Sequence, residues 1–150
     1  MAWETLFTLT NLWALLSWAL LVFAPRKPAV MSAVLFLGVA LLCLAYAIML
    51  GLLMSGSVDA GGPSGGMDFT TLAGVMALFD SKGGAVIGWT HYLAFDLFIG
   101  LWIARDADAK GIGRLWQSPV LVLTLLVGPV GLLLWLIIRE PRARAAARAR

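Results

Sequence analysis

Long apolar runs separated by short polar segments dominate this sequence. A membrane-spanning helix needs about 20 mostly apolar residues, because each residue adds about 1.5 Å along the helix axis. Three uncharged runs meet this length: 6–24, 31–54 and 120–138. A fourth run, residues 85–104, also meets it but contains His91 and Asp96. The pattern therefore predicts an all-α bundle of about four transmembrane helices.

A shorter apolar segment, residues 69–79, lies between the second run and the run that holds Asp96. The Gly- and Ser-rich stretch 55–66 precedes it, and the polar residues 80–84 follow it. Such stretches are typical of loops and helix breaks. Because the segment between them is too short to cross a bilayer, we expect an interfacial or re-entrant helix.

The composition agrees with this pattern. Hydrophobic residues make up 61% of the 150 residues and charged residues 13%, and the mean hydropathy is +0.93. A water-soluble domain has no room to bury that much apolar surface. We therefore expect one transmembrane domain at 1–140 and an arginine-rich tail at 141–150. The single cysteine, Cys43, excludes an intramolecular disulfide.

The basic residues leave the membrane orientation open if all four runs cross. One side would then hold five of them, namely Arg26, Lys27, Arg105, Lys110 and Arg114. The other side would hold six, namely Lys82 with Arg139, Arg142, Arg144, Arg148 and Arg150. The positive-inside rule does not separate five from six. An arginine-rich tail directly after a span predicts contact with membrane lipid headgroups and not with nucleic acid.

Asp96 is the residue that sets the fourth run apart, because it lies close to the middle of the predicted helix. A charge at the centre of a bilayer costs at least about 2.5–3.5 kcal/mol, so the side chain should face the protein interior and have a partner there. Two interpretations remain open. Asp96 is either a protonated, hydrogen-bonded acid that joins helices, or a proton donor, proton acceptor or ligand contact.

His91 lies five residues before Asp96, which is about 500° around a helix, so the two side chains point roughly 140° apart. His91 shares its face with Phe95, Phe98 and Trp102, whereas Asp96 shares its face with other residues of this run. Those residues are Trp89, Tyr92 and Gly100. A lone histidine near a helix end either bonds to a neighbouring helix or takes part in chemistry, and the sequence leaves both open.

Small residues and a proline add a candidate site around Asp96. Gly84, Gly88, Tyr92, Asp96 and Gly100 recur every four residues, a ridge that allows close approach of a helix or of a flat ligand. The pair Gly128-Pro129 interrupts the last run near its midpoint, because proline cannot donate a helical hydrogen bond. We expect this kink at the depth of Asp96. Asn11 and Tyr46 are candidate partners from the first two helices.

Several kinds of site are excluded by the residues that the sequence lacks. One histidine excludes a multi-histidine diiron cluster and bis-histidine haem within the chain. No lysine falls in a predicted span, which excludes a retinal Schiff base. The sequence has no Gly-rich phosphate loop, and we predict no cofactor and no metal site. Arg105, Asp106 and Asp108 are interpreted as a turn with local ion pairs, with an interfacial metal as the alternative.

Residues 89–104, with Trp89, His91, Asp96 and Gly100, resemble the hallmark of the neoxanthin-synthase-like family. Its plant members are named for abscisic acid deficiency. The segments Leu123-Thr124 and Gly128-Pro129-Val130-Gly131 are similar to a second signature of that family, and Asn11 and Ala24-Pro25 to weaker features. The resemblance implies a compact helical membrane domain that forms neoxanthin from violaxanthin without a recognised redox cofactor.

The sequence departs from the family pattern at two points. Leu101 stands where the family often has a basic residue, and a plant-type transit sequence is missing. We therefore expect a multi-pass protein of a bacterial inner membrane. The resemblance then implies carotenoid or related isoprenoid chemistry as a class, and the particular substrate stays open.

A redox-neutral isomerisation fits these residues. Opening an epoxide to an allene and a tertiary alcohol moves protons but no net electrons, and a neutral carboxylic acid supplies the first proton. In this hypothesis Asp96 is the general acid, and His91 or Tyr92 is the accessory group. The expected substrate-binding residues are Trp89, Phe95, Trp102, Gly100, Pro129, Asn11 and Tyr46. The alternative is a pigment- or lipid-binding protein without catalysis, or a small proton-coupled carrier; the oligomeric state stays open.

Overall fold

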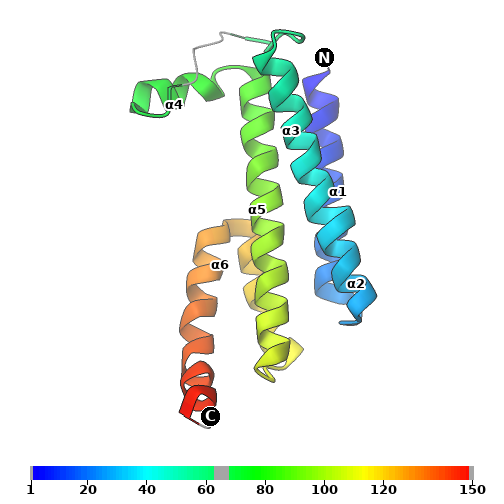
Figure 1. Cartoon of the computed structure of the whole chain (residues 1–150), viewed down its shortest axis with the longest axis vertical. Coiled ribbons are helices and arrows are strands. Elements are labelled where there is room, and N and C mark those ends of the chain that lie inside the picture. The colour runs from blue at the N-terminus through cyan, green and yellow to red at the C-terminus, as the bar shows by residue number, and fades with distance from the viewer. Residues whose placement is uncertain (1, 63–67, 149–150) are drawn as a thin grey trace.

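The structure is a computed structural model that describes residues 2–62 and 68–148. Within these ranges the chain is mostly helical; short turns connect most of the helices, and a longer loop separates Met54 from Leu72. Four helical stretches are long and apolar enough to cross a membrane, which confirms the predicted all-α membrane bundle. Figure 1 shows the long helices side by side, with one short helix extending from the end of the bundle near the N-terminus.

The first two membrane-length rods form a helical hairpin. Helix α1 (Trp3–Phe23) ends just before Pro25, as expected for a residue that cannot continue a helix. The return rod consists of α2 (Pro28–Ala33), a π-helical segment η1 (Val34–Ala40) and α3 (Leu41–Met54). Where η1 crosses α1, a Cβ on Gly38 would lie 2.9 Å from Ser17 Oγ, so the glycine permits close packing.

The short apolar segment forms α4 (Leu72–Phe79), which projects sideways from the start of α5. Thr71 caps it by accepting a hydrogen bond from Gly74 N at 3.1 Å. None of its residues is buried, and it is too short to cross a membrane, as predicted. Phe79 packs against Gly88, and Leu78 against Gly84, so these two glycines serve helix packing.

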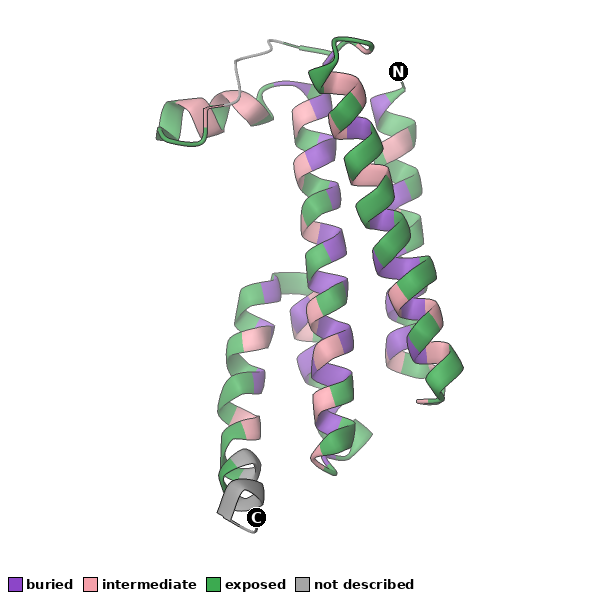
Figure 2. Cartoon of the chain, in the orientation of Figure 1, coloured by how far each residue is buried: buried purple, intermediate pink, exposed green. Residues whose placement is uncertain are grey.

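Helix α5 (Lys82–Ala109) is the central helix, and its buried residues face α1, the η1–α3 rod and α6. Figure 2 shows buried positions along the inner faces of the long helices and exposed positions on their outer faces. Many exposed residues are large and apolar, for example Phe23 and Phe36, as expected for helices surrounded by lipid. Asp96 is fourteen residues after Lys82 and thirteen before Ala109, which places it at the middle of α5.

The last helix, α6 (Arg114–Arg148), reverses direction at its middle. Val127 has a non-helical backbone, with φ −148° and ψ 62°, and Pro129 follows two residues later. A Cβ on Gly131 would lie 2.6 Å from Thr124 Cα. Seven residues of a straight helix would separate these positions by about 10 Å along the axis, so the chain has folded back on itself.

Contacts with α5 give the direction of each arm of α6. Gln117 bonds to Asp108 and Gly128 meets Asp96, so the first arm, residues 114–126, runs antiparallel to α5. Arg139 then bonds to Asp106, so the second arm, residues 128–148, runs parallel to α5. We call this element the re-entrant hairpin. Its tip lies at the depth of Asp96, and both of its ends lie at the same end of the bundle.

The reversal changes the distribution of basic residues. The hairpin starts and ends at the same end of the bundle. That end holds the basic residues Arg26, Lys27, Arg105, Lys110, Arg114, Arg139 and Arg144. Lys82 lies at the other end of the described chain, where it pairs with Glu4 at the start of α1. The expected kink is thus a turn, and the positive-inside rule now gives a clear orientation. By this rule we expect the arginine-rich end to face the cytoplasm and α4 to lie on the opposite side of the membrane.

Candidate functional site

The tip of the re-entrant hairpin covers the Asp96 carboxyl. Asp96 is 9% exposed, so the side chain faces the protein interior next to Gly128, as predicted. A Cβ on Gly128 would lie 2.6 Å from Asp96 Cγ, which is too close for any side chain. Glycine at this position therefore lets the backbone of the tip rest directly on the carboxyl group.

One oxygen of this carboxyl has no partner. Asp96 Oδ2 is buried, and no atom of the described residues lies within hydrogen-bonding distance and geometry. Buried polar atoms are normally hydrogen-bonded, and an exception points to a bound group or to a chemical role. The Asp96 carboxyl also lies next to the first residues of the second arm of α6. The unpaired N–H groups at the start of a helix favour a negative charge or a polar ligand.

Tyr92 lies one helical turn before Asp96 and meets the same glycine. Gly128 N donates a hydrogen bond to the Tyr92 hydroxyl at 3.4 Å. The Tyr92 ring stacks on Trp89, with ring centroids 5.4 Å apart and an interplanar angle of 25°. Trp89 Nε1 in turn donates to Asn11 Oδ1 at 3.0 Å. Contacts from α1 and from the hairpin tip therefore position Tyr92 beside Asp96.

A second group of predicted site residues lies on another face of α5. His91 stacks on Phe95, with centroids 4.5 Å apart, and packs against Tyr46 of α3 at 5.5 Å. His91 and Tyr46 also line an apolar pocket of about 450 Å³ beneath α4. The pocket walls come from α3, α4 and α5, among them Leu50, Phe79 and Ile87. The sequence did not predict this pocket, because it depends on where α4 packs.

Three further candidates lie in different surroundings. Gly100 packs against the ring of Trp18 on α1, so its space is filled by a neighbouring helix. Trp102 lies toward the arginine-rich end, where the Arg139 guanidinium is 5.5 Å from its ring centroid. Pro129 begins the second arm and is exposed. The structure thus gathers Asn11, Trp89, Tyr92, Asp96 and Gly128-Pro129 at one site, and Tyr46, His91 and Phe95 at another.

Asp106 holds the second arm against α5. It accepts hydrogen bonds from Arg139 Nε at 2.7 Å, Trp135 Nε1 at 3.0 Å and Lys110 Nζ at 2.5 Å. The turn predicted at Arg105, Asp106 and Asp108 is wrong, because these residues lie in the last turns of helix α5. Asp106 has a local ion pair with Lys110, whereas its bond to Arg139 depends on the reversal of α6. No group of three or more possible metal ligands occurs in the described parts of the chain.

Membrane-length helices, a re-entrant hairpin and a buried carboxyl at its tip define a small polytopic membrane protein with an intramembrane acid. A family model described as ABA DEFICIENT 4-like matches residues 5–135, and the chain belongs to this family. The match confirms the resemblance found in the sequence. It covers α5 and the hairpin tip, so the Asp96 site lies within the family region. Comparisons with curated proteins and with solved structures found no match.

Proposed function

We propose that this protein binds a carotenoid or a related isoprenoid within the membrane and isomerises it without net oxidation, with Asp96 as the general acid. The observation that carries the proposal is the buried Asp96 Oδ2, which has no partner among the described residues. An acid used only to join helices would place its oxygens on donors of neighbouring helices. The family membership supports the substrate class.

The chemistry follows from a carboxylic acid in an apolar site. Asp96 donates its proton to the oxygen of a strained ether such as an epoxide, and the C–O bond breaks to give an alcohol and a carbocation. The Asp96 carboxylate left by the first step then takes back a proton from the polyene chain, which forms the new double bond and restores the acid. The substrate and product have the same composition, so no oxidant or reductant is consumed.

Tyr92 is the better accessory group of the two that the sequence offered. Its hydroxyl and the Asp96 carboxyl both meet Gly128, so one small substrate group is able to contact both. His91 packs between Tyr46 and Phe95 on another face of α5. We therefore assign His91 to the pocket beneath α4 and give Tyr92 the role of orienting the reacting oxygen or passing on a proton.

The half of α5 that precedes Asp96, residues 82–95, offers an apolar surface to which the isoprenoid would bind. The hairpin reaches no farther than Tyr92 and Asp96, and α4 packs at Gly84 and Gly88. Between these contacts Trp89 is 42% exposed and Phe95 is 56% exposed. A polyene lying here would have one end in the pocket beneath α4 and a polar group at the hairpin tip.

The decisive experiment replaces the acid and keeps its shape. Asp96→Asn should leave the amount of folded protein unchanged, because the amide has nearly the same volume and still forms hydrogen bonds. Conversion of carotenoid substrates in a pigment-producing host should fall about 10²–10⁴-fold, because an amide cannot deliver a proton. Glu140→Gln removes an exposed carboxylate from the same hairpin and is the matched control. Turnover by the Asn variant at the wild-type level would rule out Asp96 as the acid.

One observation favours a second function. Helices broken at the middle of the membrane beside an ionisable group are typical of secondary transporters, and here the broken helix meets Asp96. A proton-coupled carrier of this size would need several subunits around a pathway. Proteoliposomes with an internal pH indicator distinguish the two functions. Proton uptake that depends on an added solute and is lost in Asp96→Asn would establish the carrier, and substrate isomerisation without proton uptake would establish the enzyme.

A further inference from the structure

The turn between α1 and α2 carries a mostly buried guanidinium, two of whose nitrogens have no hydrogen-bond partner among the described residues. The Arg26 side chain is 10% exposed, and its nearest acid is Asp108, with Nη1 and Oδ2 3.5 Å apart. Its Nε and Nη1 are buried and have no hydrogen-bond partner among the described residues. Buried arginine donors normally bond to carboxylate, phosphate or carbonyl oxygens. Arg26 therefore lacks the acceptors that its position requires.

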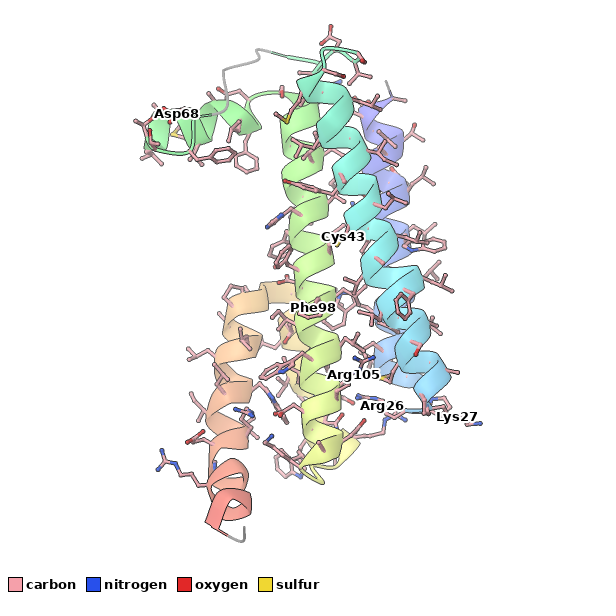
Figure 3. All side chains as sticks on the ribbon, in the orientation of Figure 1. Arg26, Lys27, Cys43, Asp68, Phe98 and Arg105 are labelled. Carbon is pink, nitrogen blue, oxygen red and sulfur yellow. The ribbon has the colours of Figure 1, made fainter. Side chains whose placement is uncertain are left out.

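Further basic residues surround the same place. Arg114 bonds through Nη2 to the carbonyls of Val22 and Ala24, which ties the start of α6 to the end of α1 beside Arg26. Arg105 precedes Asp108 by three residues, so the two are neighbours on the surface of α5. Figure 3 shows Arg26, Lys27 and Arg105 at this same end of the molecule.

The charges around Arg26 do not balance. Arg26, Lys27, Arg105 and Arg114 contribute four positive charges, and Asp108 contributes one negative charge, which leaves three positive. Asp108 also accepts a hydrogen bond from Gln117 at 3.0 Å, so it is not reserved for Arg26. Burial, followed by the nearby Arg114, lowers the pKa of Arg26, while Asp108 raises it. An anion here would supply both the missing acceptors and the missing charge.

We propose that Arg26, Arg105 and Arg114 form a binding site for the phosphate group of an anionic membrane lipid on the cytoplasmic side. Phosphate oxygens match the donor geometry of guanidinium groups, and the turns between helices lie where lipid headgroups are found. The site is separate from Asp96 and does not depend on the proposed chemistry. A bound lipid would hold the α1–α2 turn against the α5–α6 turn.

Native mass spectrometry of the full-length protein in micelles tests this site. The protein is supplied with phosphatidylglycerol or with phosphatidylcholine, and the bound lipids are counted. We expect the wild type to retain the anionic lipid at least about tenfold better. Arg105→Gln should lose most of this preference without unfolding, because the Arg105 side chain is exposed. Arg26→Gln should lose it as well, with folding monitored by circular dichroism.

The control variant is Arg144→Gln, which removes an exposed arginine from the same membrane side, where it pairs with Glu140. It should keep the lipid preference. Equal losses in Arg105→Gln and Arg144→Gln would mean that only overall charge matters, and they would overturn the proposal. Displacement of the lipid by millimolar inorganic phosphate would assign the site to free phosphate, and equal retention of both lipids would show that no phosphate-lipid site exists.

Discussion

Replacement of Gly128 by alanine tests the contact between the hairpin tip and Asp96. The added methyl group would lie 2.6 Å from Asp96 Cγ and 2.7 Å from Oδ2, both far inside van der Waals contact. Gly128 has no positive φ, so alanine strains no backbone angle and the cost is steric. Overpacking of this kind typically costs about 1–3 kcal/mol. We expect Gly128→Ala to lose that much unfolding free energy in SDS-containing mixed micelles.

A double-mutant cycle shows whether this loss comes from Asp96. Asp96→Ala removes the carboxyl that the new methyl group would meet, so Gly128→Ala should cost close to nothing in that background. The coupling energy should therefore be about 1–3 kcal/mol, as for residues in direct contact. Gly113→Ala is the control, because a Cβ there meets no atom within 4 Å. Additive losses from Gly128→Ala and Asp96→Ala would refute the placement of the tip on Asp96.

Two further predictions concern the hairpin as a whole. In a cysteine-free background, single cysteines are treated with a membrane-impermeant maleimide added outside intact cells. The reagent should label Ser57→Cys but neither Gly113→Cys nor Arg144→Cys. Labelling of only one of Gly113→Cys and Arg144→Cys would mean that α6 crosses the membrane. Arg139→Gln should lower the unfolding free energy by about 1–3 kcal/mol, because Asp106 loses one of its two charged partners, the one that joins the second arm to α5. The measurement is the same SDS titration, and a loss no larger than that of Arg144→Gln would show that Arg139 does not hold the arm.

The sequence predicted the membrane-length helices and the inward-facing position of Asp96, because both follow from the cost of placing polar groups in lipid. It did not predict the partners, because Asn11 bonds to Trp89 and Tyr46 packs on His91. It also placed Gly128-Pro129 at the depth of Asp96, since both lie near the middle of an apolar run. It did not predict the reversal of α6. A proline in a helix is compatible with a kink or a turn, and hydropathy measures the length of a run, not its path.

The contacts that distinguish a kink from a turn join residues far apart in the sequence. Arg139 bonds to Asp106 and Gly131 packs on Thr124, and neither pairing has a periodic signal along the chain. The separation of His91 from Asp96 was predicted, because it depends only on helical geometry. The partner of His91 was not, since the pocket beneath α4 forms only when three helices come together.

The reversal of α6 has a consequence for the way in which the protein enters the membrane. An ordinary fourth span would require the arginines after residue 138 to be carried through the bilayer, at a high cost for each charge. The hairpin avoids this translocation, because its first arm starts and its second arm ends at the arginine-rich end, which we expect to face the cytoplasm. Its tip bonds to Tyr92 of α5 through Gly128 N. We therefore expect the last quarter of the chain to insert from the cytoplasm after the three crossing rods are in place, and to stop at Asp96.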